Sequence, residues 1–291
     1  MGNGKAARPI ALVLFVCATL RGGVPEDLKK AQDLYNRTDY KGVLQLLDRA
    51  GYTDAAVYGW VGKSSFMLGD YKKATDALQH AVTLDPHNSE YAHWLGRTYG
   101  RRAELSNLFA APGHAAKARQ YFERAVALDP SNAEALNDLF DYYLQAPGFL
   151  GGGFDKAAKL AEQIAALDPA EGHFAQAQLA DKRKQFDTAE EHFRRAMELA
   201  PRQVGRAIDL AKYLAKLGRY QESDAAFARA EALAPHSPKV IFAKAKTLIQ
   251  EKRNIDQARE LLKIYLRCEL TPDDPPREQA EKLLKQVTSG V

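Results

Sequence analysis

The polar side chains that could bind a ligand recur along a series of amphipathic segments and do not gather in one catalytic motif. They are mainly cations and amides, which recognise carboxylates and peptide groups through charge-assisted hydrogen bonds. The candidates, which we expect on one inward face, are Lys63, His93, Arg97, Arg101, Asn137, Asp141, Gln178, Lys212, Lys216 and Lys246. Because cations outnumber acids in this set, the ligand is predicted to be an acidic peptide or one that ends in a free carboxylate. The alternative is a solvated face on which Glu90 and Glu134 balance the charge.

Motifs for catalysis, metal binding and cofactor binding are weak. The seven histidines are scattered, and none forms HExxH or a pair at helical spacing. The cluster Gly148–Gly153 has no strand before it and no Lys-Ser or Lys-Thr after it, so it matches neither a phosphate loop nor a dinucleotide fingerprint. Asp273 and Asp274 lie in a proline-rich turn, where a solvated loop is the ordinary explanation. We therefore expect no catalytic residue, no metal and no cofactor.

Charge and cysteine content exclude some partners. The formal net charge is +4, but residues 1–23 carry three basic residues and no acid, which leaves +1 for the remainder. A nearly neutral chain gives no general case for nucleic acid or for an anionic membrane surface. Only Cys17 and Cys268 are present, so a chain that has lost its leader would have one thiol and no internal disulfide. Cys268 is predicted to be a small buried residue near a helix end.

Residues 1–23 have the pattern of an export signal. A short basic region precedes the apolar run Ile10–Leu20, which is too short to span a bilayer as a mature helix but suits the core of a signal peptide. Val16 and Ala18 provide a small-residue cleavage site. We expect export with cleavage, to the periplasm or the medium. An uncleaved or lipid-modified anchor and a plain apolar N-terminus are the alternatives.

From Val24 onward the sequence repeats a two-helix unit. Five prolines follow successive second helices at spacings of 44, 39, 32 and 34 residues, and they are Pro86, Pro130, Pro169, Pro201 and Pro235. A proline just after the last turn cannot continue the helix, so the chain must change direction there.

Small residues keep step with these prolines. The second helices have them at two sites on one face, namely Ala74, Ala118, Ala157, Ala189 and Ser223, and Ala81, Ala125, Ala196 and Ala230, with Ile164 as the exception at the second site. The first helices have one such site, at Ala31, Gly62, Gly96, Ala177, Ala211 and Ala245, with Phe140 as the exception. Small residues let a neighbouring helix approach closely, as ridge-into-groove packing requires. The aromatic residues Trp60, Trp94, Tyr142 and Tyr143 are predicted to be core residues, not a ligand box.

This pattern resembles the tetratricopeptide repeat (TPR) family. One unit matches at Tyr58, Val61, Gly62, Gly69, Asp70, Tyr71, Ala74, Ala81 and Pro86, the next at Leu95, Gly96 and Tyr99, and a later one at Leu210, Ala211, Gly218, Tyr220, Phe227, Ala230 and Pro235. The resemblance implies a right-handed superhelix whose first helices line a concave groove. The Lys and Asn clamp of the heat-shock chaperone members is not matched, because Lys63, Arg97 and Asp141 occupy the Asn sites.

Two units exceed the 34-residue TPR period, by 10 and by 5 residues, and both additions fall between paired helices. Each contains Ala-Pro-Gly, at 111–113 and at 146–148. Equivalent turns lie on the same edge of a solenoid, so the additions are predicted to form one protruding patch with Phe149 and Leu150 at its tips. A flexible turn is one interpretation of the second addition, and a partner contact is the other.

These observations predict an all-α, right-handed TPR solenoid. Residues 1–23 are a signal peptide or anchor, 24–272 form about seven helix pairs, and 273–291 form a capping helix and tail. The predicted function is a non-catalytic scaffold that binds a protein or peptide through the groove and the inter-helix loops. A membrane-anchored assembly or trafficking factor is the alternative, and an enzyme is the third hypothesis.

Overall fold

The computed structural model describes residues 24–50 and 53–288, so the predicted leader lies outside the described part. The described residues form fifteen α-helices, one 3-10 turn and no strand. The helices are α1 (Val24–Asn36), α2 (Tyr40–Ala50), α3 (Ala55–Met67), α4 (Tyr71–Leu84), α5 (Ser89–Leu105), α6 (Ala111–Leu128), α7 (Ala133–Gln145), η1 (Gly148–Leu150), α8 (Phe154–Leu167), α9 (Pro169–Lys182), α10 (Phe186–Leu199), α11 (Val204–Lys216), α12 (Tyr220–Leu233), α13 (Pro238–Gln250), α14 (Ile255–Tyr265) and α15 (Arg277–Thr288). No helix in these ranges is long and apolar enough to cross a membrane.

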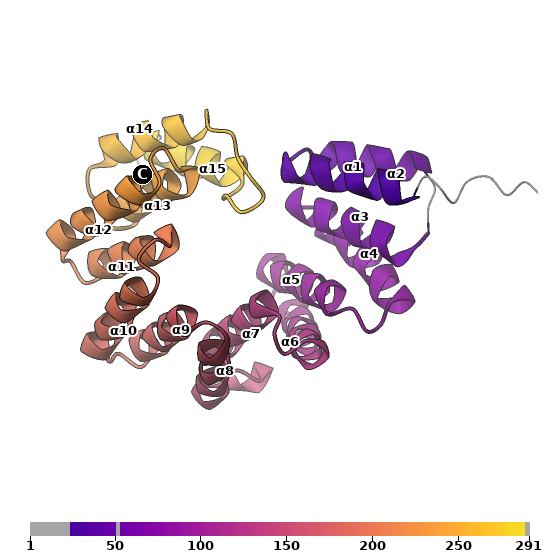
Figure 1. Ribbon diagram of the computed structural model, residues 1–291, viewed down its shortest axis with the longest axis horizontal. Helices are drawn as coiled ribbons and strands as arrows, with labels where there is room; N and C mark the ends of the chain where they lie inside the picture. Colours follow the sequence, from indigo (N-terminus) through magenta and orange to yellow (C-terminus); the bar gives the residue numbers. More distant parts are fainter. Residues whose placement is uncertain (1–23, 51–52, 289–291) are drawn as a thin grey trace, which may run out of the picture.

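The helices pair in chain order and curl into a nearly closed ring (Figure 1). The odd-numbered helices α3 to α13 lie on the inner side, and their even-numbered partners lie outside. The first pair faces the last pair and α15 across the opening of the ring, although they lie at opposite ends of the sequence. The predicted all-α TPR solenoid is therefore confirmed, with α15 closing its C-terminal end through the buried Ala280 and Val287.

Local signals explain where the helices start and stop. Asp70 and Asn88 accept hydrogen bonds from backbone N–H groups three residues ahead, so each caps the helix that follows. Gly69 has φ of +76°, which allows the chain to leave α3 and enter α4 without strain. Only Asp168 separates α8 from α9, and Pro169 is the first residue of α9, where its missing N–H is not needed.

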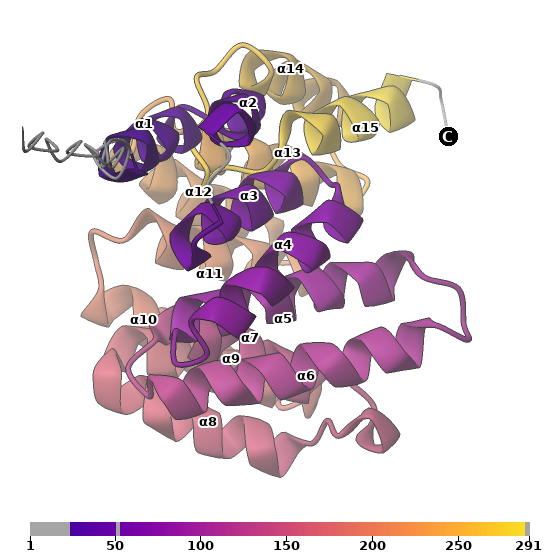
Figure 2. The same cartoon turned by 90° about the vertical axis from the view of Figure 1, so that its right-hand side faces the viewer.

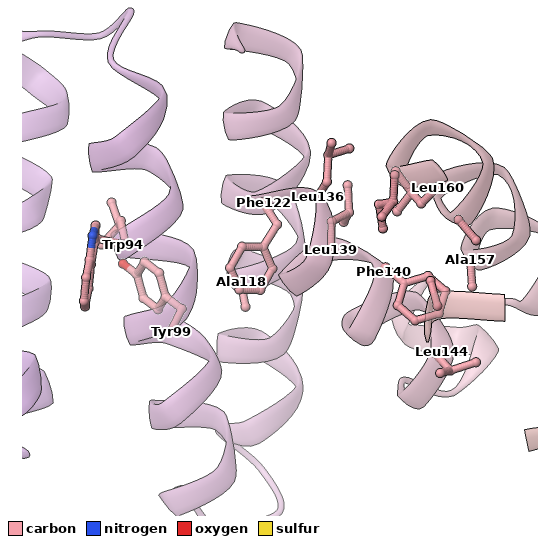
Figure 3. Close-up of a cluster of buried hydrophobic side chains, with 14 of the residues drawn as sticks. Trp94, Tyr99, Ala118, Phe122, Leu136, Leu139, Phe140, Leu144, Ala157 and Leu160 are labelled. Atoms are coloured by element: carbon pink, nitrogen blue, oxygen red, sulfur yellow. The ribbon is translucent and has the colours of Figure 1, made fainter. Parts of the chain in front are cut away.

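Close helix crossings hold the pairs together. The predicted small residues are buried throughout, and at two crossings even a methyl group would not fit. A Cβ on Gly62 would lie 2.4 Å from Leu78 Cγ, and one on Gly96 would lie 2.6 Å from Phe122 Cδ1. Between the crossings, larger side chains from successive pairs form a series of buried clusters, and the one built from α4 to α9 is the largest. Figure 3 shows its central part, with Trp94 and Tyr99 of α5, Ala118 and Phe122 of α6, Leu136, Leu139, Phe140 and Leu144 of α7, and Ala157 and Leu160 of α8.

The prediction that the first addition forms a loop is wrong. The ten added residues lengthen α5 and α6 to 17 and 18 residues, whereas α3 and α7 have 13 each. Ala111–Gly113 is the first turn of α6, a position that tolerates proline, and the alanine-rich sequence after it favours helix. The connection between α5 and α6 projects beyond the neighbouring helices (Figure 2).

The second addition is a loop, as predicted. It contains η1, and Gly151 takes φ of +88°. A Cβ on Gly151 would overlap Arg119 of α6, so the two additions lie side by side. At its tip the Phe149 side chain is 82% exposed.

We predict that Gly96→Ala destabilises the protein while Gly100→Ala, on the same helix, does not. The new methyl group at position 96 must displace the buried Phe122 ring, and such overpacking costs about 1–3 kcal/mol. At Gly100 nothing lies within 4 Å of the added Cβ, and alanine is the better helix former by about 1 kcal/mol. Denaturant unfolding followed by circular dichroism measures both. Equal stability of the two variants would contradict the close crossing.

Candidate functional site

The concave face contains two adjoining cavities that share part of their walls. The tryptophan cavity, of about 720 Å³, is lined by Tyr35, Asn36, Trp60, Lys63, Met67, Glu90, His93, Trp94, Arg97, Glu134, Asn137, Asp138, Lys239, Pro272 and Asp273. The lysine cavity, of about 750 Å³, has among its lining residues Phe66, Met67, Tyr71, Arg97, Arg101, Arg206, Asp209, Lys212, Lys239, Lys246, Pro272, Asp273 and Asp274. Together they form one groove that residues from both ends of the chain enclose. We call it the groove below.

Aromatic rings and cations alternate along one wall of the tryptophan cavity. Lys63 Nζ lies 4.7 Å from the centre of the Trp60 ring, and Arg97 Cζ lies 4.4 Å from that of Trp94. Such contacts contribute roughly 0.5–2 kcal/mol each, depending on desolvation. Trp94 is only 9% exposed, so the expectation of a core role holds for most of its surface. However, both indoles also form the wall of the groove, which that expectation did not include.

His93 is a buried structural residue and offers little surface to a ligand. Its side chain is about 1% exposed, and Nε2 lies 2.7 Å from Asp138 Oδ2, which joins α5 to α7. Arg97 Nε lies 3.7 Å from the same carboxylate, and Lys63 forms an ion pair with Glu90. Most of the cations in the tryptophan cavity are therefore already neutralised by acids of the neighbouring helix.

The lysine cavity contains two cations that no ion pair neutralises. Of the six cations that line it, Arg97, Arg101, Arg206 and Lys212 are in ion pairs, whereas Lys239 and Lys246 form none within the described ranges. Burial, together with the nearby Lys246 and Lys239, lowers the pKa of Lys212, although Asp209 counteracts this effect. A bound carboxylate would relieve the mutual repulsion of the lysines.

A third, smaller cavity of about 450 Å³ adjoins Arg97 and Arg101 and reaches the second addition, where Pro147 and Leu150 line it. Its floor includes Asp141. Burial is the largest cause that raises the pKa of Asp141 from 3.8 to about 6, and the nearby carboxylates of Asp138 and Glu171 contribute to the same shift. This acid therefore changes charge in the mildly acidic pH range.

The structure brings together most of the predicted ligand-binding residues. Lys63, His93, Arg97 and Asn137 line the tryptophan cavity; Arg97, Arg101, Lys212 and Lys246 line the lysine cavity; Asp141 and Leu150 line the smaller one. Gln178, Lys216 and Phe149 line none of the three. Lys216 lies in an ion pair with Asp181, at 2.6 Å.

Sequence reasoning missed several groove residues. Lys239 is in the first turn of α13. We counted inward-facing positions from the small residue at the helix crossing, Ala245, and that count did not extend back to the first turn. Asp273 belongs to the proline-rich turn that we interpreted as an ordinary solvated loop, and although it is exposed, it lines both cavities. Tyr35 near the end of α1 was assigned no role either. Their spacing along the chain gave no sign that the first and last helix pairs meet.

Metal-binding and thiol chemistry have little support. In the ranges that the structure describes, no group of three or more His, Cys, Asp or Glu residues could hold a metal ion. His173 and His192, which looked unrelated in the sequence, approach to 2.8 Å between their Nδ1 atoms across α9 and α10. Cys268 is half-buried, not fully buried as predicted, and its Sγ donates to the carbonyl of Ile264 at 3.4 Å.

Paired helices around a concave groove define the class of α-solenoid proteins, and sequence comparison assigns the family. Three tetratricopeptide repeat profiles match the chain, at residues 55–88, 170–203 and 208–275. The chain belongs to the tetratricopeptide repeat family. Proteins of this family are typically non-catalytic scaffolds that bind other proteins. No curated protein matches the chain.

Solved structures agree with this fold. A TPR protein from Parabacteroides merdae is 16% identical, with 91% of this chain and 98% of that chain covered and a TM-score of 0.60. A thermophilic TPR protein from Thermus thermophilus is 22% identical, with 65% and 98% covered and a TM-score of 0.54. The Cut9–Hcn1 hetero-tetramer of the APC/C is 17% identical, with 91% and 49% covered and a TM-score of 0.51. At these identities the likeness shows the fold alone.

We predict that Asp141→Asn stabilises the protein at neutral pH but not in acid. The raised pKa means that the folded state binds this proton more tightly than the unfolded state, so stability falls as the pH rises from about 4 to about 6. Asparagine cannot ionise, and the gain above that range is at most about 3 kcal/mol, at about 1.4 kcal/mol per pKa unit.

Denaturation midpoints of the wild type and Asp141→Asn, compared at pH values below 4 and above 7, measure this effect. Asp187→Asn, which removes an exposed carboxylate of α10, is the control. An Asp141→Asn midpoint that differs from the wild type equally at both pH values would show that burial of the charge is not the cause.

Proposed function

We propose that this protein is a non-catalytic scaffold whose groove binds an extended, acidic peptide segment of a protein partner. The observation that supports this most strongly is the presence of two lysines, Lys239 and Lys246, that line the lysine cavity without an ion pair in the described residues. A partner carboxylate in this position gains charge-assisted hydrogen bonds, which are stronger than neutral ones.

The form of the groove favours an extended chain over a small molecule. The two cavities share Met67, Arg97 and Lys239 and are open to solvent along the inner face of the ring. The amide groups of Asn36 and Asn137 line the tryptophan cavity, where they can bond to the backbone of a peptide. The indole rings next to them provide apolar contact area.

The alternative, a charge-balanced solvated face, fits one part of the groove only. In the tryptophan cavity Glu90 and Asp138 neutralise Lys63 and Arg97, as that interpretation requires. In the lysine cavity the arginines and Lys212 are paired in the same way, but Lys239 and Lys246 have no such partner among the described residues. We therefore assign recognition of acidic side chains to the lysine cavity, and recognition of apolar or backbone groups to the tryptophan cavity.

We predict that Lys239→Glu with Lys246→Glu weakens binding of an acidic peptide at least tenfold. Reversing two charges replaces attraction with repulsion at the proposed contact, and tenfold corresponds to about 1.4 kcal/mol. The probe is a fluorescein-labelled decapeptide of alternating Glu and Ala, measured by fluorescence anisotropy at low salt. Trp60 and Trp94 are the only tryptophans and both line the groove, so intrinsic fluorescence independently reports its occupation.

The matched control is Lys72→Glu with Lys159→Glu, which makes the same change of charge at exposed lysines of the outer helices α4 and α8. If both double variants lose affinity equally, long-range attraction accounts for binding and the groove assignment is wrong. If the wild type does not bind the acidic decapeptide at all, the acidic partner is excluded.

We propose further that the protein acts outside the cytoplasm, on the basis of residues 1–23. Mass spectrometry of the protein purified from its own host should find the mature N-terminus between about Thr19 and Gly22. An intact or acylated leader would instead support the membrane-anchored assembly factor. Detection of the whole chain in the cytoplasm would exclude both.

A further inference from the structure

The loop that connects α14 to α15 lies inside the groove. Pro272 and Asp273 line the tryptophan cavity together with Tyr35 and Trp60 of the first two helix pairs. The same two residues, with Asp274, also line the lysine cavity. In Figure 1 this connection reaches from the C-terminal helices toward α1, across the opening of the ring. We call residues 271–276, with the sequence TPDDPP, the acidic loop.

The acidic loop is held from one side only. Asp274 accepts hydrogen bonds from the backbone N–H and the hydroxyl of Thr271, and Tyr265 of α14 donates to the carbonyl of Pro275. Arg277 donates to the carbonyls of Leu266 and Cys268. Within the described ranges, no hydrogen bond or ion pair joins the loop to α1, α3 or α5. The loop is therefore shaped by its own end of the solenoid and only rests beside the other end.

The position of Asp273 is chemically suited to the groove. Its carboxylate is exposed, forms no ion pair in the described part, and lines both cavities, as do Arg97 and Lys239. The pKa of Tyr40 in α2 is raised to about 12, mainly by burial and to a smaller extent by the negative charge of Asp273. Asp273 thus supplies negative charge to the same two cavities as Lys239, one of the two lysines proposed to bind a partner.

The prolines next to it fit the aromatic wall. Pro272 and Asp273 form the middle of a β-turn, which the Asp274 N–H closes on the carbonyl of Thr271 at 3.1 Å, and proline fixes φ at the first of these two positions. Pro272 lines the same cavity as the indoles of Trp60 and Trp94, and aromatic-lined grooves are known to bind proline side chains. The acidic loop thus combines a carboxylate, which suits the lysine cavity, with proline rings, which suit the aromatic wall of the tryptophan cavity.

We propose that the preferred occupant of the groove is an acidic, proline-containing segment of a protein partner, and that the acidic loop occupies part of that site as an internal competitor. This inference rests on the proposed function and adds two claims to it. The partner segment contains proline as well as acid, and the partner must displace Pro272 and Asp273 to bind fully.

The test uses the full chain and a double variant, Pro272→Ala with Asp273→Ser. These changes remove the two side chains that line both cavities but leave the Thr271–Asp274 hydrogen bonds in place. The probe is the fluorescein-labelled peptide LTPDDPPRE, which copies residues 270–278. We expect it to bind the double variant about tenfold more tightly than the wild type, because a competitor that occupies the site lowers apparent affinity by the fraction of sites left open.

Two altered peptides and a control variant identify the cause. A peptide with both aspartates changed to asparagine should lose most of its affinity, and LTADDAARE, without prolines, should bind several-fold more weakly than the parent. Asp187→Ser, which removes an exposed acid on the outer helix α10, should bind the parent peptide like the wild type.

Three results would overturn the proposal. Equal affinity of the wild type and the double variant for LTPDDPPRE excludes internal competition, and equal affinity for LTADDAARE and the parent peptide excludes a role for proline. The Glu-Ala decapeptide can still bind in both cases, so the proposed function would survive. If sedimentation shows that the wild type self-associates and the double variant does not, the loop occupies the groove of a second copy instead.

Discussion

The close approach of helices at small residues is the constraint on which the rest of the structure depends. Gly62 under Leu78 and Gly96 under Phe122 leave no room for a methyl group, so each inner helix settles into its outer partner at a fixed position. A single helix pair cannot bury its remaining apolar face, and the next pair must cover it. Each helix pair is therefore rotated relative to the previous pair by a similar small angle. These rotations add up along the chain and produce the curvature of the ring.

That curvature creates the groove. Because the ring nearly closes, residues from the first two helix pairs and from the loop before α15 line the same cavity. Cations and acids that are far apart in the sequence are brought together there. The balance of positive and negative charge differs between the N-terminal and the C-terminal half of the groove. In the N-terminal half, carboxylates of α5 and α7 neutralise the cations, whereas Lys239 and Lys246 of α13 stay unpaired among the described residues.

The sequence predicts the parts of this structure that depend on neighbours in the chain. The positions of Ala74 and Pro86 and their equivalents gave the helix pairs, and the inward faces gave most of the groove residues. The first addition was misjudged, because added length alone does not distinguish a loop from two longer helices. The roles of Tyr35 and Asp273 could not be predicted, since they depend on the sum of all the small rotations between pairs.

The one-sided attachment of the acidic loop links this geometry to affinity. Hydrogen bonds fix the loop to α14 and α15, so its conformation does not depend on the N-terminal wall of the groove. A ligand that takes its place gains the contacts with Trp60 and Arg97 but must also move, or fit beside, a segment that is already ordered. In the proposed competition, a ligand that reaches both cavities displaces the loop more readily than one that reaches a single cavity, because it gains more contacts. The loop would then raise the threshold for binding and favour long segments over short ones.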